Sequence, residues 1–246
     1  KKYDVNIAYV TPSHQFPTGA IMSISRRTEL LNWANENPDC YIVEDDYDSE
    51  FKYTGRPIPA LKANDINDKV IYLGSFSKSI SPAIRVSYLV LPKALLNIYQ
   101  RELPYFICPV PTLNQKILYR FIKDGYFVKH INKMRTLYKK KREFLVNTIK
   151  TYSSKILNKE IQIQGADAGL HMVIKLNQKI NEKLFLNECL ENSLKLYSLE
   201  EYNIEEIHRE KSYFLLGYAN LTNKEIEEGI LLLLKILKNF LNTHLK

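Results

Sequence analysis

Residues 70–91 read VIYLGSFSKSISPAIRVSYLVL, and this stretch decides how the rest of the chain is interpreted. The apolar run at residues 70–73 ends at Gly74, a pattern typical of a buried strand followed by a turn. Lys78 follows that turn, with serines on both sides and Arg85 further on. A lysine placed there is able to hold an aldehyde cofactor as a Schiff base, while hydroxyls and a guanidinium bind its phosphate. A solvated lysine in a serine-rich loop is the alternative.

A second apolar run, residues 41–43, ends in the acidic sequence EDDYD at residues 44–48. Carboxylates at the carboxyl end of a buried strand lie on the rim where open α/β sheets bind their ligands. Asp45 in that place is able to keep a pyridine nitrogen protonated, and Tyr47 to hydrogen-bond a phenolate oxygen. A solvated turn or a divalent-cation site explains the same acidic cluster, so these residues alone leave the alternatives open.

Three motifs together carry a family resemblance. They are TPSHQFPTG at residues 11–19, EDDYDSEF at residues 44–51 and YLGSFSKSISPAIRVSYLVLP at residues 72–92. In this order and at these separations they resemble the aminotransferase-like domain of the MocR family of bacterial regulators, the GabR-type proteins. Weaker matches extend the resemblance over nearly the whole chain, at residues 125–138, 169–171 and 216–221.

The resemblance implies the α/β architecture of the fold-type I transferases that depend on pyridoxal 5'-phosphate (PLP). We expect residues 1–125 to form part of the PLP-binding large domain, a mostly parallel sheet with one antiparallel strand. Residues 126–155 are expected to form a long connecting helix, and residues 156–246 a small C-terminal α+β domain. In the family a winged helix-turn-helix and the beginning of the aminotransferase-like domain come first, so this chain resembles the C-terminal part of a longer protein.

The resemblance also implies residue roles. Lys78 would form the internal aldimine with PLP and serve as base and acid in a proton shift. Asp45 would pair with the pyridine N–H, and Tyr47 would bond the ring hydroxyl oxygen. The phosphate would be contacted by Ser75, Ser77 and Arg85. A metal ion has no part in this set.

Two departures from the related enzymes limit the expected chemistry. Phe16 stands where many of them have an asparagine that touches the cofactor ring oxygen. The late strand at residues 213–218 lacks the arginine that holds a substrate carboxylate, the preceding loop reads Glu-Glu-Tyr at residues 200–202, and Arg209 has no predicted place. Because a charge-assisted contact of this kind contributes about 1.5–3 kcal/mol, ordinary amino-acid transamination is not expected.

The leading functional hypothesis is a PLP-binding effector domain of a MocR-type transcription regulator. A small amine or amino acid would exchange onto the aldimine of Lys78, and the resulting motion would reach a DNA-binding domain outside this chain. A PLP-dependent aminotransferase and a degenerate half-domain without cofactor are the alternatives. A serine acyl-transferase that uses the SxxK at residues 75–78 is a weaker one, because the sequence contains neither SDN nor KTG. By resemblance we expect a homodimer.

Composition sets broader bounds. With 246 residues, 45% of them hydrophobic, the chain is able to bury one large or two small cores. No apolar run approaches the roughly 20 residues of a membrane span, and no signal peptide precedes the first expected strand, which favours a cytoplasmic protein. The three cysteines are an odd number and lie far apart, so neither a disulfide framework nor a zinc site is indicated.

The formal charge of +8 favours anionic partners such as a phosphorylated cofactor or nucleic acid. The densest basic run, residues 139–142, lies inside a helical pattern, which favours a solvated helix face over a DNA footprint.

Periodicity predicts strands at about residues 6–10, 41–44, 70–73 and 86–91, the last one antiparallel because its connection is too short for a crossover. A helix is predicted at about residues 23–36, with Leu30, Leu31 and Trp33 packing inward and Arg26, Arg27 and Glu29 facing outward. Further helices are predicted at 93–103, 112–123, 126–151, 181–192 and 223–241, and further strands at 169–176 and 213–219.

Overall fold

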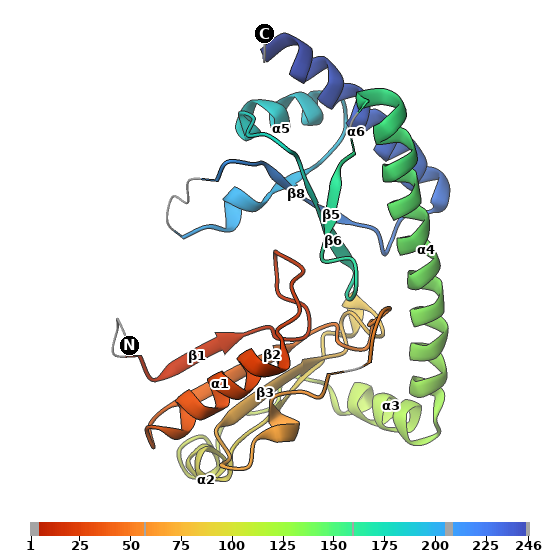
Figure 1. The fold of residues 1–246 in the computed structure, drawn as a ribbon. Coiled ribbons are helices and arrows are strands. Elements are labelled where there is room, and N and C mark those ends of the chain that lie inside the picture. Colours follow the sequence, from red (N-terminus) through yellow and green to blue (C-terminus); the bar gives the residue numbers. More distant parts are fainter. Residues whose placement is uncertain (1–4, 57, 159, 205–208, 245–246) are drawn as a thin grey trace. The chain divides into compact units, whose positions relative to one another are not determined.

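The computed structural model describes residues 5–56, 58–158, 160–204 and 209–244, and it contains two β-sheets with helices around them (Figure 1). The chain divides into two compact units. The first comprises Lys1–Gln15 and Ala20–Arg135, and the second comprises Phe16–Gly19 and Thr136–Lys246. In the described residues, each unit contains one four-stranded sheet.

The sheet of the first unit is mostly parallel. Its strands, in spatial order, are β1 (Ile7–Val10), β2 (Tyr41–Asp46), β3 (Val70–Ser75) and β4 (Ser87–Val90). The first three run parallel to one another, whereas β4 is antiparallel to β3. The antiparallel pairing predicted from the short link between β3 and β4 is therefore confirmed.

The register of this sheet places three strand ends at one edge. Val10 at the end of β1 pairs with Glu44, and Asp46 at the end of β2 pairs with Gly74 on β3. Parallel strands carry their carboxyl ends at the same edge of a sheet. The loops that follow β1, β2 and β3 therefore leave the sheet as neighbours, and these loops contain the three sequence motifs.

Helix α1 (Ile24–Asn35) covers the middle of this sheet and begins at a capped end, where the Ser23 side chain accepts a hydrogen bond from the Arg26 backbone N–H. A buried apolar cluster fixes the helix on the sheet. Full burial of a Val, Leu or Ile side chain contributes about 1.5–3 kcal/mol to the free energy of folding. The cluster consists of Ala34, Ile42, Leu61 and Val70, with Val10, Leu30, Leu31 and Trp33 packed against it. The inward packing predicted for the apolar face of α1 is therefore confirmed.

Arg27 does not lie where the pattern predicted. An outward-facing side chain was expected, but Arg27 is only 3% exposed. The prediction was wrong because hydrophobic periodicity assigns every charged residue to solvent, whereas an arginine surrounded by carbonyl oxygens is able to satisfy its donors inside the protein.

Helices α2 (Lys93–Glu102) and α3 (Thr112–Lys123) follow β4, and Pro92 and Pro111 immediately precede them. Their ends agree with the predicted ones to within a residue. Both helices and the segment between them expose large apolar side chains, and we call residues 96–119 the exposed apolar segment. Its exposed large apolar members are Leu96, Ile98, Tyr99, Leu103, Tyr105, Phe106, Ile107, Leu113, Ile117 and Tyr119.

The long helix α4 (Tyr126–Leu157) starts in the first unit and ends in the second, since the boundary between the units follows Arg135. Ile131, Tyr138 and Leu145, at seven-residue intervals, are buried. The helix extends beyond its predicted end near residue 151.

The basic run within α4 is solvated only in part. Lys139 and Lys140 are exposed. The next two residues are half-buried, because the Lys141 ammonium donates to the Ala219 carbonyl and the Arg142 guanidinium to the Ala166 carbonyl, each at 2.7 Å. The interpretation of the run as a solvated face therefore applies to its first half.

The sheet of the second unit is antiparallel. In spatial order it consists of β5 (Gln162–Gln164), β6 (His171–Lys175), β8 (Tyr213–Gly217) and β7 (Tyr197–Ser198). Helices α5 (Glu182–Glu191) and α6 (Asn223–His244) complete the unit. Phe185 on α5 packs against Phe214 on β8 and Phe240 on α6, with ring centroids 5.3 Å apart in both pairs. The sequence did not predict β5 and β7, since three and two residues are too short for a visible alternation.

The predicted fold class is confirmed: a mostly parallel sheet with one antiparallel strand precedes an α+β unit. The three cysteines are free thiols. No helix in the part of the chain that the structure describes is long and apolar enough to cross a bilayer.

Candidate functional site

The carboxyl edge of the first sheet carries the loops with the sequence motifs. Residues 11–15 follow β1, residues 47–51 follow β2 and residues 76–80 follow β3. A hydrogen bond of 3.0 Å from the Phe76 N–H to the Val86 carbonyl brings the residues before β4 to the same edge. The structure thus gathers the predicted site residues at one edge of one sheet. They are Asp45, Tyr47, Ser75, Ser77, Lys78 and Arg85.

Asp45 lies on the half-buried face of β2 and accepts a short hydrogen bond from the phenol of Tyr9 on β1. This hydrogen bond, with burial as a second cause, raises the pKa of Tyr9 to about 12. Tyr9 is therefore a proton donor at neutral pH. Because a carboxylate has two oxygens and about four lone-pair positions, Asp45 is able to accept a further donor.

Tyr47 follows β2 directly, and its phenol donates a hydrogen bond of 2.6 Å to the backbone carbonyl of His14 in the loop after β1. Burial raises the pKa of Tyr47 far above that of a free phenol, and the charges of Asp48, Asp45 and Asp46 raise it further. Tyr47 is thus a protonated phenol at every physiological pH.

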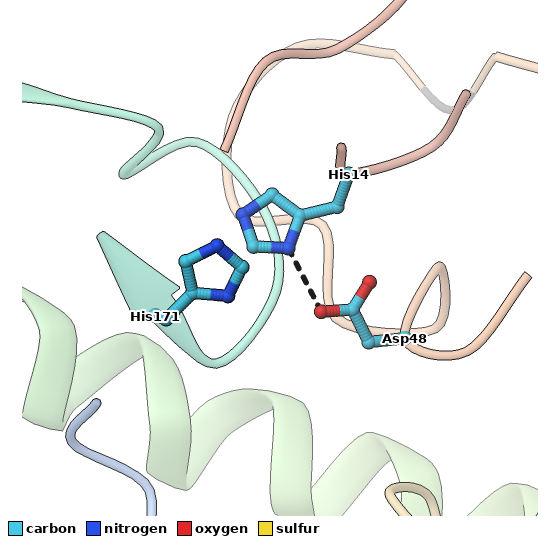
Figure 2. Close-up of side chains that lie close together, drawn as sticks. All are labelled: His14, Asp48 and His171. Carbon is cyan, nitrogen blue, oxygen red and sulfur yellow. Dashed lines mark hydrogen bonds and ion pairs between the residues drawn. The ribbon is translucent and has the colours of Figure 1, made fainter. Parts of the chain in front are cut away.

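His14 and Asp48 form a buried pair beneath this phenol. Nδ1 of His14 lies 2.8 Å from Oδ2 of Asp48, and the two side chains are 0% and 2% exposed (Figure 2). Burial raises the pKa of Asp48, while the hydrogen bond to His14 and the positive charge of Lys78 act in the opposite direction. The pair joins the loop after β1 to the loop after β2.

Arg27 and Glu44 hold the loop after β1 and the loop between β2 and β3 through hydrogen bonds to their backbones. The Arg27 guanidinium donates to the carbonyls of Pro12, Met22 and Pro59 at 2.8–3.1 Å. It also lies 3.9 Å from the Glu44 carboxylate. The Glu44 oxygens accept the backbone N–H groups of Leu61 and Lys62 at 2.7 and 2.9 Å. Burial lowers the pKa of Arg27 and raises that of Glu44. Two ionisable side chains thus fix two loops, the one between β1 and α1 and the one between β2 and β3.

Asp46 on the buried face of β2 and the half-buried Glu50 in the turn after it are two further carboxylates of this strand and loop. Asp46 accepts hydrogen bonds of 2.7 Å from the hydroxyls of Ser49 and Tyr72. Burial raises the pKa of Glu50 to about 7, and the charges of Asp46 and Asp48 act in the same direction. Alternation along β2 places Glu44 and Asp46 on the buried face and Asp45 on the half-buried one.

Lys78 lies exposed in a turn after β3. The turn is closed by a hydrogen bond of 2.8 Å from the Ile80 N–H to the Phe76 carbonyl. Nε2 of His130, on the first turns of α4, lies 3.0 Å from the Ser79 carbonyl and supports the turn. In the described residues the Lys78 amine makes no hydrogen bond or ion pair, so a ligand at this edge has access to it.

The predicted phosphate contacts surround this turn. Ser75 ends β3, and its hydroxyl oxygen accepts the Ser77 N–H at 3.1 Å, which leaves the Ser75 O–H proton available to another acceptor. Arg85 is exposed and has a left-handed backbone, with φ 49° and ψ 40°. Such a conformation is uncommon for a residue other than glycine and is found more often at ligand sites.

The departures noted in the sequence fall in the second unit. Phe16 packs edge-to-face against His171 and Tyr202, with ring centroids 5.6 and 5.0 Å apart. Arg209 donates to the Asn203 side chain at 3.2 Å, and its guanidinium lies 5.3 Å from the centre of the Tyr213 ring. Glu200 is ion-paired with Lys179. Arg209 is thus engaged by neighbours within its own unit.

Sequence reasoning missed five side chains that support the site: Tyr9, His14, Arg27, Glu44 and Asp48. Four of them lie within or beside the quoted motifs, but the motifs give no contact between the loops. The usable signal was the alternation in residues 44–48, in which Glu44, Asp46 and Asp48 are the buried positions. Arg27 gave no signal of its burial.

Residues 7–231 match the family model described as aminotransferase class I and II. The uncharacterized HTH-type transcriptional regulator YdeL of Bacillus subtilis is 38% identical over 231 residues, which cover 94% of this chain and 48% of YdeL. The probable rhizopine catabolism regulatory protein MocR of Rhizobium meliloti is 31% identical over 224 residues, 91% of this chain and 44% of that protein. The chain spans about half the length of these relatives.

Solved aminotransferases have the same fold. The multiple substrate aminotransferase of Thermococcus profundus gives a TM-score of 0.85 at 27% identity, over 98% of this chain and 58% of that one. The kynurenine aminotransferase of Pyrococcus horikoshii, solved in complex with PMP, gives 0.84 at 26% identity, over 97% and 57%. The relatives confirm the resemblance to MocR-type regulators, and the chain belongs to the aminotransferase class I and II family.

Proposed function

We propose that this chain is the PLP-binding, aminotransferase-like effector domain of a MocR-type transcription regulator. The observation that carries the proposal is the convergence of an exposed lysine, a carboxylate and two serine hydroxyls at the carboxyl edge of one sheet. Regulators named as such are among the relatives that match nearly the whole chain.

The side chains at this edge fit the chemical groups of the cofactor. Lys78 offers an amine for the aldehyde, and Asp45 offers a carboxylate to the pyridine N–H. Tyr47 is expected beside the ring oxygen. The phosphate would be bound by Ser75, Ser77 and Arg85, whose hydroxyls and guanidinium suit a dianion. When bound, PLP supplies an aldehyde that captures primary amines and a ring that accepts electrons.

The chain's own residues would then act as follows. Asp45, with Tyr9 as a second donor to its carboxylate, favours a protonated ring nitrogen through charge attraction. Lys78 holds the cofactor, gives up its place to an incoming primary amine and, once released, is able to carry a proton. A small amine or amino acid is therefore the effector class that we propose.

The remaining parts of the proposal concern the longer protein. DNA binding would belong to a winged helix-turn-helix outside this chain, in the cytoplasm, since the relatives are HTH-type regulators of twice its length. We also propose that residues 1–125 are the cofactor-binding part, 126–155 a connecting helix and 156–246 the small domain, and that the protein is a homodimer.

A PLP-dependent aminotransferase is the second candidate, because enzymes of that class share the fold at 26–27% identity. Repeated turnover of an amino donor with a keto acid distinguishes the two. An effector domain exchanges its amine once per cofactor, whereas an aminotransferase forms product in large excess over protein.

The test is a titration of the chain with PLP, followed by visible absorbance, borohydride reduction and peptide mass mapping. We expect a coloured complex with the cofactor fixed on the peptide that contains Lys78. Lys78→Ala should abolish the colour, whereas Lys116→Ala, at an exposed position on α3, should not change it. A coloured complex that survives Lys78→Ala, or none in the parent chain, would contradict the proposal.

A further inference from the structure

Two hydrogen bonds shorter than 3 Å join His14 to the dipeptide Tyr47-Asp48, and the Tyr47 phenol oxygen also lies 3.5 Å from Nδ1 of His14. The carbonyl of His14 accepts the Tyr47 phenol proton at 2.6 Å, and the His14 ring lies 2.8 Å from the Asp48 carboxylate. One residue of the loop after β1 is thus fixed to two consecutive residues of the loop after β2. A shift of His14 along either loop would break both contacts together.

The depth of these contacts makes the arrangement stiff. His14 and Asp48 are each 1% exposed, so water is not available to replace either partner. A buried polar group that loses its partner carries the full cost of desolvation, which strongly disfavours alternative positions of the two loops. Tyr47, by contrast, is only half-buried and thus accessible from the site.

We propose that His14 and Asp48 are positioning residues, which fix the place of the Tyr47 phenol oxygen relative to the ring oxygen of PLP. In this structure the phenol donates its one proton to the His14 carbonyl, so a hydrogen bond to the ring oxygen would draw that proton away from the carbonyl. This inference rests on the function proposed above. Neither residue touches the cofactor in this proposal; both act through Tyr47. The buried Asp48 carboxylate is hydrogen-bonded to His14, whereas the half-buried Asp45 carboxylate is hydrogen-bonded to Tyr9, so the role of Asp48 differs from that of Asp45.

The carboxylates near the Tyr47 phenol all raise its pKa. Asp45, Asp46 and Asp48 favour its protonated form, and the positive charge of Lys78 acts on Asp48. Moving the phenol would change the hydrogen bonding of the cofactor's ring oxygen. It would thereby change the proton affinity of the nearby Lys78 nitrogen, through which the cofactor is bound. The pH at which the visible absorbance of the lysine-bound cofactor changes reports on that proton affinity.

The experiment compares this spectral midpoint in the parent chain, Tyr47→Phe, Asp48→Asn, His14→Gln and the double variant Tyr47→Phe/Asp48→Asn. We expect Tyr47→Phe to shift the midpoint by about one pH unit or more. Asp48→Asn and His14→Gln should shift it in the same direction by at least half as much. The double variant should equal Tyr47→Phe alone, because residues that act through one group are not additive.

Glu182→Gln is the matched control. Glu182 is a buried carboxylate of the second unit, 4% exposed, that accepts a hydrogen bond from Ser198. Its variant should be less stable to urea with an unchanged midpoint. An unshifted midpoint in both Asp48→Asn and His14→Gln, or in Tyr47→Phe, would overturn the inference, as would additive shifts. Failure of the parent chain to bind PLP at Lys78 would overturn the proposed function instead.

Discussion

The Arg27 side chain is able to hold two loops together because of its shape. A guanidinium has five N–H donors in a rigid plane, and here the carbonyls of Pro12, Met22 and Pro59 accept from it. Lysine has a single charged point and cannot reproduce that fan of donors. The loops before and after the β2 motif therefore share one anchor, which lies beneath the site rather than in it.

Replacing Arg27 should be costly. Arg27→Met removes the guanidinium donors from the carbonyls of Pro12, Met22 and Pro59 and leaves the buried Glu44 carboxylate without its positive partner, so we expect a loss of about 3–5 kcal/mol in the free energy of unfolding. Urea titration followed by circular dichroism measures it. The neighbour Arg26 has a side chain that is 77% exposed, and Arg26→Met should change the free energy by less than about 0.5 kcal/mol. An equal loss of unfolding free energy in the two variants would contradict the role of Arg27 as an anchor of the loops.

The pH dependence of stability should depend on Glu50. Its folded-state pKa of about 7 exceeds the ordinary value of 4.5, so between these two pH values the unfolded chain binds fewer protons than the folded one. Stability should therefore fall as the pH rises from about 4.5 to about 7, by up to about 3 kcal/mol, and then level off. Glu50→Gln should weaken this slope and be more stable than the parent chain at about pH 8. Urea midpoints across this range provide the measurement, with the exposed Glu143→Gln as control.

At the residue scale the sequence predicts which side chains belong to the candidate site better than it predicts the hydrogen bonds that hold them. Asp45, Lys78 and Arg85 were placed near one another because strand ends are readable from apolar runs. The partners Tyr9 and His14 were not, because a hydrogen bond between neighbouring strands or between the loops that follow them depends on the register of the strands, and composition does not encode register. Arg27 was placed on the wrong side, since its burial depends on carbonyls far away in sequence.

Among the elements, strand β3 depends on a residue without a side chain. A Cβ atom on Gly74 would lie 2.1 Å from the Tyr88 ring of the adjacent strand β4. That ring packs over the glycine at a non-terminal position of the β3–β4 pair, where Gly74 faces Tyr88 directly. The turn that carries Lys78 begins two residues later, so the packing of this pair bears directly on the turn.

Gly74→Ala should therefore displace the Tyr88 ring and cost about 1–3 kcal/mol, the usual range for overpacking. Gly217 on β8 is the control, because a Cβ there meets nothing within 4 Å and Gly217→Ala should be nearly neutral. Adding Tyr88→Ala to the Gly74 variant should recover part of the loss, measured by urea titration. A Gly74→Ala chain as stable as the parent would show that the ring moves aside without cost.

Elements were the most predictable level. All six α-helices in the described chain were expected from 3.6-residue periodicity, with ends mostly within two residues, because long apolar stripes average out local exceptions. The ends of α4 and α6 were the exceptions, six and three residues beyond the predicted ones. The strands β5 and β7 were not predicted, since their pairing with longer neighbours, and not their own pattern, makes them strands.

The whole molecule consists of two units, each with its own sheet and its own buried core. The first unit exposes many large apolar side chains, most of all along residues 96–119, the exposed apolar segment. Tyr105 is 92% exposed and Ile107 is 90% exposed, values unusual for several large apolar side chains close together in sequence. The expected homodimer would cover such a segment.

We expect Ile107→Asp to weaken self-association. A charge placed inside an apolar interface remains without a partner, which should raise the dissociation constant at least tenfold. Sedimentation velocity over a range of concentrations measures the change. Ile66→Asp is the control, because Ile66 is 95% exposed but lies outside the exposed apolar segment. Equal effects of the two substitutions would place the interface elsewhere.

The hydrogen bonds from two backbone N–H groups to the Glu44 carboxylate bear on the order in which the chain folds. Leu61 and Lys62 lie seventeen and eighteen residues after Glu44, so the carboxylate closes a loop of modest length onto the strand that carries it. Closing such a loop costs little chain entropy compared with pairings between distant segments. The acidic strand and the loop behind it are therefore expected to assemble early as one local unit, on which the more distant lysine turn is later added.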